Sequence, residues 1–267
     1  MTPQDSSPPS GPSTADRAGL PLRRANRSPV QPTYRRAAAF AGWLLRRLVR
    51  QNWDDAASLP ADGGVIVVSN HISNFDPPCL AHYLVWHGRW PRALGKSDLW
   101  RVPIVGALAR ATGQIPVERG TERAKDALVH ARAALEAGEC VVIYPEGTIT
   151  ADPDTWPMTA RPGAARLALS TGCPVIPVGQ WGANLVMPGK KPVWPRFRPR
   201  RTVSFRAGAP VMLDDLLGST DPEDVRAAGA RMMEAITALV AEIRQEPAPD
   251  GVYDIRVGAR VARPDAR

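Results

Sequence analysis

The amino-acid sequence predicts a single α/β domain whose mixed, largely buried β-sheet is flanked by helices. Short β-branched runs, such as Val65–Ser69 and residues 141–143, are bounded by turn residues, which is typical of buried strands. Between these runs, apolar residues recur at helical spacing. The chain has 267 residues, of which 44% are hydrophobic, so it can bury one substantial core.

The first 53 residues divide into a tail and a helix. Residues 1–33 are rich in Pro, Ser, Gly and Arg, so we expect a disordered basic tail with no secretory signal. Residues 34–53 have arginines on one helical arc and aliphatic residues opposite, with Phe40 and Trp43 among the arginines. This pattern predicts an amphipathic helix that either lies in a membrane interface or packs on the core. No window reaches the roughly 18–20 uncharged apolar residues that span a bilayer.

His71 and Asp76 follow the strand expected at Val65–Ser69, in the loop that leads to the next helix. Asp76-Pro77 predicts a helix start, with Asp76 as the N-cap and proline in the first turn. We expect one Asp76 oxygen to cap the helix while the other holds the His71 imidazole. A neutral imidazole held by a carboxylate can take a proton from an alcohol near neutral pH. Taken alone, the pair also fits a structural loop histidine.

The later elements are predicted from periodicity and from the Gly, Pro and Asp residues at their ends. Strand-like runs occur within residues 113–120, 174–179 and 203–205, and helices are expected over 78–90, 121–137, 162–171 and from Asp221 to about Gln245. Gly138 and Gly172 end the second and third of these helices. We therefore place the catalytic domain at residues 54–245 and a polar tail at 246–267.

Positive charge is concentrated in two zones. Residues 1–53 hold nine Arg and two Asp, and residues 155–213 hold seven Arg and two Lys with no acidic residue. Two such zones indicate a polyanionic partner: nucleic acid, anionic lipid headgroups or a phosphorylated substrate. The alternative is a solvated basic surface.

The three cysteines Cys79, Cys140 and Cys173 are widely spaced and form no C-x-x-C pair. This argues against a disulfide framework or a zinc site and fits a reducing compartment. Cys79 is near His71 in the sequence, but its place at a helix start favours a small buried residue over a nucleophile.

Other catalytic motifs are incomplete. Gly95-Lys96-Ser97 resembles the end of a P-loop, but Trp90 stands where the first glycine is needed. There is no G-x-S-x-G nucleophile elbow and no H-E-x-x-H. Asp152-Pro153-Asp154 resembles the carboxylate pair of metal-dependent glycosyltransferases, a pattern that is common by chance.

Four sequence blocks occur in one order between residues 65 and 179. They are Asn70-His71-x4-Asp76, the run 113–120 that ends in Arg119-Gly120, Pro145-Glu146-Gly147-Thr148, and Val175-Ile176-Pro177-Val178. With these blocks the chain resembles the glycerolipid acyltransferase family, whose type member is 1-acyl-glycerol-3-phosphate acyltransferase. Family-like sequence continues to about residue 215. The resemblance implies the family's glycerol-3-phosphate acyltransferase-like fold for residues 54–245.

The resemblance also implies a role for each matched residue. His71 would be the general base and Asp76 the carboxylate that fixes its tautomer, as in a catalytic triad without a covalent nucleophile. Glu146, Gly147 and Thr148 would position the acceptor's glycerol. Arg119 would hold its phosphate, with Lys96 as a second cation. The predicted substrate contacts are thus Asn74, Lys96, Arg119, Glu146, Gly147 and Thr148. Without the resemblance, Arg119 and Lys96 also fit solvated surface charges, and Glu146-Gly147 also fits a simple turn.

One residue departs from the family pattern. Arginine commonly follows Glu-Gly-Thr in the family, whereas this chain has Ile149. Isoleucine cannot pair with a phosphate, so either Arg119, Lys96 or Arg161 compensates, or the acceptor is not a simple phosphomonoester. The acyl-transfer step itself does not depend on this residue.

The sequence therefore predicts a peripheral acyltransferase at the cytoplasmic face of the cell membrane. It would move a fatty acyl group from acyl-CoA or acyl carrier protein, as co-substrate and without a cofactor or metal, to a lysophospholipid. We expect 1-acyl-sn-glycerol-3-phosphate as acceptor, phosphatidic acid as product, an anionic membrane surface as partner and no nucleic acid. The alternatives are a glycolipid or other lysolipid acceptor, and a non-catalytic basic membrane-binding module.

Overall fold

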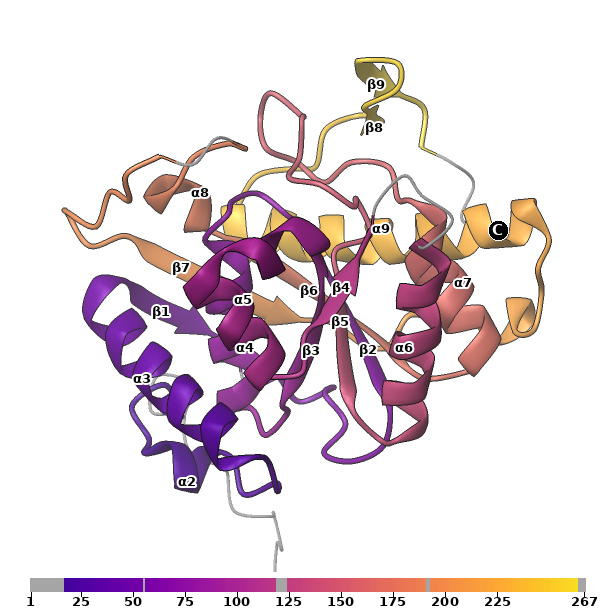
Figure 1. Ribbon diagram of the computed structural model, residues 1–267. Coiled ribbons are helices and arrows are strands. Elements are labelled where there is room, and N and C mark those ends of the chain that lie inside the picture. Colours follow the sequence, from indigo (N-terminus) through magenta and orange to yellow (C-terminus); the bar gives the residue numbers. More distant parts are fainter. Residues whose placement is uncertain (1–16, 55, 119–123, 191–192, 264–267) are drawn as a thin grey trace, which may run out of the picture.

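A mixed seven-stranded sheet forms the centre of the protein in the computed structural model, which describes residues 17–54, 56–118, 124–190 and 193–263 (Figure 1). The strand order is β1-β7-β6-β2-β5-β3-β4. All neighbouring strands are parallel except β6 and β7. The strands are β1 (Arg50–Trp53), β2 (Val65–Ser69), β3 (Pro91–Lys96), β4 (Ile115–Val117), β5 (Cys140–Ile143), β6 (Val175–Trp181) and β7 (Thr202–Ala207). The predicted mixed sheet is thus confirmed.

Helices cover both faces of this sheet. The α-helices around it are α2 (Leu22–Ala25), α3 (Pro32–Leu48), α4 (Asp76–Trp86), α5 (Pro103–Ala111), α6 (Ala124–Glu136), α7 (Pro162–Thr171), α8 (Ala183–Val186) and α9 (Pro222–Arg244). Two short 3-10 helices, η1 (Ser97–Arg101) and η2 (Asp214–Leu216), complete the set. Two predicted details are confirmed: Asp221 caps α9 through the Glu223 N–H, and Gly172 ends α7 in the left-handed conformation.

The central strand β2 divides the core into two layers. Ile66 and Val68 pack with α6, α7 and α9, whereas Val65 and Val67 pack with α3 and α4. Successive side chains of a strand point to opposite faces, so a continuous β-branched run can fill both layers. All five residues of β2 are buried, and this rigid strand positions the loop that follows it.

The N-terminal boundaries differ from those predicted. Residues 1–16 lie outside the described part of the chain, but residues 17–33, expected to be disordered, are folded. Leu22 is buried, and Asn26 donates its side-chain amide to the Val85 carbonyl of α4. The helix expected over 34–53 ends at Leu48, and residues 50–53 form β1 beside β7. A side-chain contact to α4 and strand pairing to a distant segment are tertiary effects that local composition does not reveal.

The C-terminal segment is also folded, whereas a polar tail was expected. Strands β8 (Val252–Asp254) and β9 (Ala259–Val261) form an antiparallel hairpin. Arg260 binds the carboxylates of Asp152 and Asp154, and the Thr159 N–H bonds to the Tyr253 carbonyl. These contacts fix the hairpin against the loop after β5, above the carboxyl ends of the strands (Figure 1).

Candidate active site

The loop after β2 lies at the carboxyl end of the central strand, between β5 and β6. Asn70 fixes its start, because its side chain exchanges two hydrogen bonds with the backbone of Gln180 at the end of β6, at 2.9 and 3.0 Å. Parallel sheets bind their ligands at this edge. The predicted position of His71, in the strand-to-helix loop, is confirmed.

His71 and Asp76 form the predicted pair. His71 Nδ1 lies 2.9 Å from Asp76 Oδ2, and the same oxygen accepts the backbone N–H groups of Ile72 at 2.6 Å and Ser73 at 2.8 Å. Since Oδ2 accepts from all three, Nδ1 carries the ring proton. The free lone pair of the imidazole is therefore on Nε2, which is the tautomer that a general base requires.

Two predicted details of Asp76 are wrong. The N-cap of α4 is Phe75, and Asp76 is already the first helical residue. Oδ2 makes the three hydrogen bonds with the loop, whereas Oδ1 is buried without a hydrogen-bond partner among the described residues. The Asp76 carboxylate thus binds the backbone of the loop that precedes it instead of capping α4. Burial raises the pKa of the Asp76 carboxyl, and the hydrogen bonds from His71, Ser73 and Ile72 oppose this rise.

Glu146 holds the backbone of the catalytic loop. It is 2% exposed, and its two oxygens accept the N–H groups of His71 at 2.7 Å and Met158 at 3.0 Å. Both oxygens therefore bind protein backbone, and the contact of Glu146 with a substrate stays a prediction. Burial raises the pKa of this carboxyl from 4.5 to about 8, although the two N–H bonds lower it.

Gly147 brings an arginine to the site. Its φ is 68°, and a side chain there would collide with Arg161, since a Cβ atom would lie 2.5 Å from Arg161 Cδ. Arg161 precedes α7, and its N–H bonds to the Pro145 carbonyl at 2.8 Å. Thr148 beside Gly147 is half-buried, while Ile149 is buried in the interior. Of the two described cations proposed to compensate for Ile149, Arg161 lies against the Glu-Gly-Thr block, and Lys96 pairs with Asp98 instead.

The other predicted substrate contacts are not brought to His71. Asn74 is exposed and donates to the Lys190 carbonyl at 3.2 Å. Lys96 ends β3, with a side chain that is 58% exposed and paired with Asp98. Neither side chain lines the cavity beside His71 described below, because each is engaged at the surface. Arg119 lies outside the described residues.

Two alternative chemistries have no support in the geometry. Cys79 is buried, and burial raises the pKa of its thiol well above the ordinary value, so it is a poor nucleophile. Asp152 and Asp154 both bind Arg260, as structural anchors of the hairpin. No cluster of potential metal ligands occurs within the described residues.

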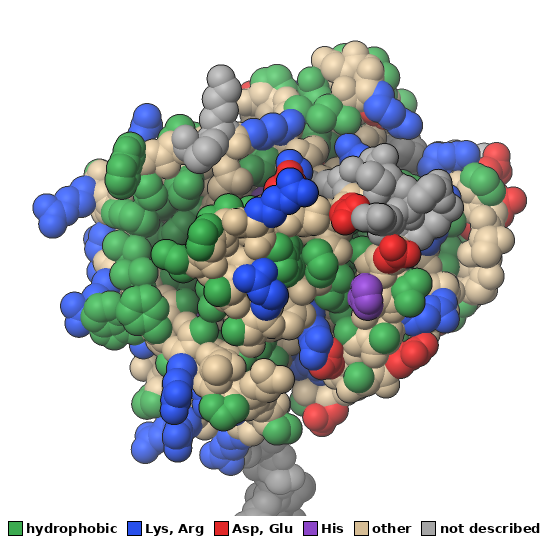
Figure 2. Space-filling model, in the orientation of Figure 1, with side chains coloured by type: hydrophobic (Ala, Val, Ile, Leu, Met, Phe, Trp, Pro, Cys, Tyr) green, Lys and Arg blue, Asp and Glu red, His purple; other side chains and the backbone are tan. Residues whose placement is uncertain are grey.

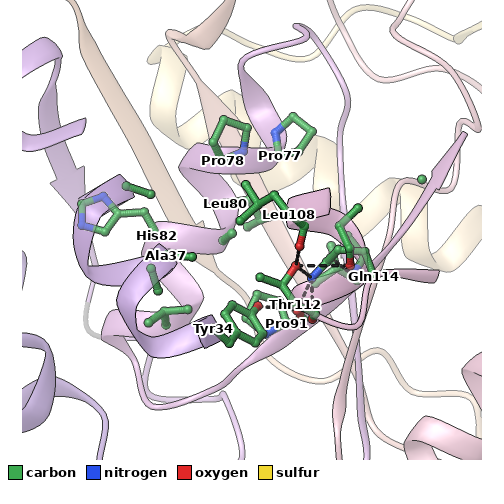
Figure 3. Close-up of a pocket in the computed structure, with 18 of the residues that line it drawn as sticks. Tyr34, Ala37, Pro77, Pro78, Leu80, His82, Pro91, Leu108, Thr112 and Gln114 are labelled. Carbon is green, nitrogen blue, oxygen red and sulfur yellow. Dashed lines mark hydrogen bonds between the residues drawn. The ribbon is translucent and has the colours of Figure 1, made fainter. Parts of the chain in front are cut away.

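Tyr144, the residue before Pro145, joins the polar loop to an apolar cavity. Its ring stacks on the His71 imidazole, with centroids 4.3 Å apart and an interplanar angle of 18°. Tyr144 also lines a cavity of about 330 Å³ between α3, α4, β3 and α5 (Figure 3). Sequence reasoning missed this residue; its place at the end of a buried strand, directly before the Pro-Glu-Gly block, was the available signal.

The cavity is lined almost entirely by apolar atoms, and we call it the tunnel. Ala37 of α3, Leu80 of α4 and Leu108 of α5 face it from three sides (Figure 3). Of the polar side chains in its wall, Tyr34 donates to the Pro91 carbonyl at 2.7 Å, and Gln114 binds Thr112. The Tyr144 hydroxyl and His82 Nε2 are buried without a hydrogen-bond partner among the described residues. A wall that is so largely apolar suits a hydrocarbon chain.

Apolar side chains continue from the tunnel onto the surface. Large hydrophobic residues are exposed on α3 and on the segment of η1 and α5: Phe40, Trp43, Leu44, Leu99, Val102, Ile104, Val105 and Leu108. We call this set the apolar rim. Figure 2 shows hydrophobic side chains gathered over this part of the molecule, with basic side chains beside them. None of the helices described is both long and apolar enough to cross a membrane.

Comparison with known proteins finds one matching family model and related sequences. The sequence model of a protein family described as "Acyltransferase" matches residues 51–181. Two curated relatives are chloroplastic 1-acyl-sn-glycerol-3-phosphate acyltransferases, one from Brassica napus, 29% identical over 133 residues, and one from Arabidopsis thaliana, 29% identical over 139 residues. These matches cover 49% and 51% of this chain and 37% of each relative.

A solved structure shares the fold. The crystal structure of the 1-acyl-sn-glycerophosphate acyltransferase PlsC from Thermotoga maritima superimposes with a TM-score of 0.63. The alignment covers 81% of each chain at 24% identity. It therefore confirms the predicted acyltransferase-like fold.

Proposed function

We propose that this protein transfers a fatty acyl group from a thioester to a lysophospholipid hydroxyl, a function supported by the match of residues 51–181 to the acyltransferase family model and by the similarity to 1-acyl-sn-glycerol-3-phosphate acyltransferases. The observation that carries the proposal is the stacking of Tyr144 on His71. The stacking places the imidazole against Tyr144, a side chain that lines a hydrocarbon-sized tunnel. A base beside an apolar cavity is the arrangement that acylation of an alcohol needs.

The proposed reaction is a direct transfer. His71 Nε2 takes the proton of the acceptor hydroxyl while the oxygen attacks the thioester carbonyl. The C–S bond then breaks, and the imidazolium returns the proton to the departing sulfur. Asp76 Oδ2 keeps Nδ1 protonated and stabilises the positive ring during the step. The tunnel holds the acyl chain and excludes water, which limits hydrolysis of the thioester.

The acceptor's phosphate is assigned to Arg161. The Arg161 side chain lies against Gly147, is exposed and has no hydrogen-bond or ion-pair partner among the described residues. A planar, permanently charged fork matches the phosphate group better than a lysine does. Arg161 thus takes over the role that an arginine at position 149 commonly has in the family, and 1-acyl-sn-glycerol-3-phosphate is the acceptor that we propose.

The apolar rim is assigned to a membrane surface with anionic headgroups. Trp43 belongs to the apolar rim, and the guanidinium of Arg47 lies over its ring, 4.4 Å from the ring centroid. Exposed aromatic and aliphatic side chains flanked by arginine are typical of interfacial binding. Since the rim continues the tunnel, the acyl chain can enter the tunnel from the membrane without crossing water.

One experiment tests this function against its alternatives. The purified chain is incubated with palmitoyl-CoA and separately with lysophosphatidate, other lysophospholipids and a glycolipid, and products are identified by mass. We expect phosphatidic acid as the main product and none with His71→Ala. Acylation of the glycolipid alone would show that the acceptor is a glycolipid and not lysophosphatidate. Vesicle binding without thiol release from any donor would instead support the non-catalytic binding module.

A further inference from the structure

A second cavity of about 540 Å³ lies outside the site described so far. It is enclosed by the start of α7, one face of α9 and the C-terminal hairpin β8–β9. Its floor contains the apolar side chains of Val225, Met233 and Val252. We call it the hairpin pocket. It exists only because the segment after residue 245 folds back onto the domain.

The hairpin pocket is strongly basic. Five arginines line it, against two acidic residues: Arg161, Arg166, Arg226, Arg256 and Arg263, with Glu234 and Asp254. Asp254 is engaged by Arg256 at 2.6 Å. Arg166 and Arg226 are exposed and have no hydrogen-bond or ion-pair partner among the described residues. Guanidinium groups that converge without partners favour a ligand with more than one negative charge.

The pocket is continuous with the catalytic loop. It shares Arg161, Pro162 and Arg166 with a smaller cavity of about 260 Å³, which Gly147 and Tyr144 also line. Tyr144 in turn borders the tunnel and stacks on His71. The three cavities are thus neighbours along the protein, with Tyr144 between the first two and Arg161 between the last two.

Resting on the function proposed above, we infer that the hairpin pocket binds the 3′-phosphorylated ADP portion of an acyl-CoA donor. The acyl chain then occupies the tunnel, the thioester lies beside His71 and the flexible arm runs past Tyr144. The nucleotide has the chemistry that the pocket offers: phosphates for Arg226 and Arg166, and a flat ring for the apolar floor of Val225 and Val252.

Direct binding tests the inference without relying on turnover. Adenosine 3′,5′-bisphosphate is titrated into the full chain by calorimetry. Arg226→Gln should weaken its affinity about tenfold, because a charge-assisted hydrogen bond is lost. Glu234→Gln, on the same helix and also exposed, should strengthen it two- to fivefold. Arg132→Gln is the matched control, since Arg132 is an exposed arginine of α6 that does not line the pocket and bonds only to the Ser170 carbonyl; it should change nothing.

Kinetics then distinguish the two substrates. With lysophosphatidate saturating, Arg226→Gln should raise the KM for palmitoyl-CoA about tenfold and leave kcat unchanged. With palmitoyl-CoA saturating, the same substitution should leave the KM for lysophosphatidate unchanged. A raised acceptor KM instead would overturn the inference, because the pocket would then hold a headgroup. So would transfer from acyl carrier protein by a chain that does not bind the bisphosphate.

The same data separate the inference from the function on which it rests. If the wild-type chain releases no thiol from any acyl-CoA, the proposed function fails and the donor assignment fails with it. Normal thiol release, with the bisphosphate affinity unchanged in both pocket variants, overturns only the inference.

Discussion

The two sides of Tyr144 are built in opposite ways. On one side, a few polar groups fix each other: Asp76 Oδ2 accepts three N–H donors, and Glu146 binds the backbone of His71. On the other side, the tunnel is defined by the largely apolar surfaces of α3, α4, β3 and α5. The acyl-transfer step thus depends on individual polar atoms, whereas selection of the acyl chain depends on the shape of the tunnel. Substitutions on the two sides should have separable effects.

The largest effect is expected at the imidazole. His71→Ala removes the general base and should lower kcat about 10³-fold, measured as thiol release from palmitoyl-CoA with lysophosphatidate. Asp76→Asn should also be severely damaging, because an amide does not fix the Nδ1-protonated tautomer. His130→Ala on α6, away from the loop, is the control. Near-normal turnover by His71→Ala would show that His71 is not the general base.

Arg161 extends the comparison to the acceptor. Arg161→Gln should raise the KM for lysophosphatidate roughly 30-fold, since the lost interaction is a charge-assisted bond to phosphate. The KM for palmitoyl-CoA should rise less, because Arg161 also lines the hairpin pocket. Steady-state kinetics with each substrate varied in turn measure this. Equal increases in both KM values would show that Arg161 does not distinguish the substrates.

A change in the tunnel should alter selection without altering chemistry. Ala37→Leu narrows the cavity (Figure 3), so kcat/KM for palmitoyl-CoA should fall roughly tenfold relative to a shorter donor such as octanoyl-CoA. Ala39→Leu, on the exposed side of the same helix, provides the control. An unchanged ratio of the two donors would mean that the acyl chain does not occupy the tunnel.

The smallest effect is a pH-dependent stability at Glu146. Its pKa is raised in the folded state, so its stabilising contribution is present below about pH 4.5 and is lost as the pH rises through about 8. Glu146→Gln does not titrate and loses one acceptor, worth about 1–3 kcal/mol. The Tm deficit of the variant should therefore shrink between pH 5 and pH 8.5. A deficit that grows over this range would contradict the raised pKa.

The sequence predicted the polar side of the site better than the apolar side. His71, Asp76 and Glu146 follow buried strands in short polar blocks, so their positions could be inferred from periodicity and turn residues. The N-cap of α4 was displaced by one residue, because the Asp76 side chain bonds backward to its own loop. The stacking of Tyr144 on His71 depends on how β5 lies beside β2, which no local pattern encodes.

The tunnel and the hairpin pocket required the folded chain. Strand β3 and helix α5, which form one wall of the tunnel, lie in a stretch where Pro and Gly interrupt any periodicity. The hairpin after residue 245 is held by Arg260 and the Asp152 carboxylate, 108 residues apart in the sequence. Contacts of this range override local propensity, and they converted an expected polar tail into a wall of a basic cavity.

The central claim is that the His71 imidazole, held by Asp76, acts as a base on the acceptor hydroxyl. Its most direct test is rapid measurement of thiol release from palmitoyl-CoA without acceptor, followed by the intact mass of the protein. We predict no burst of thiol and no acylated protein, and rapid release once lysophosphatidate is added. A stoichiometric burst with a palmitoyl adduct on the chain would contradict direct transfer.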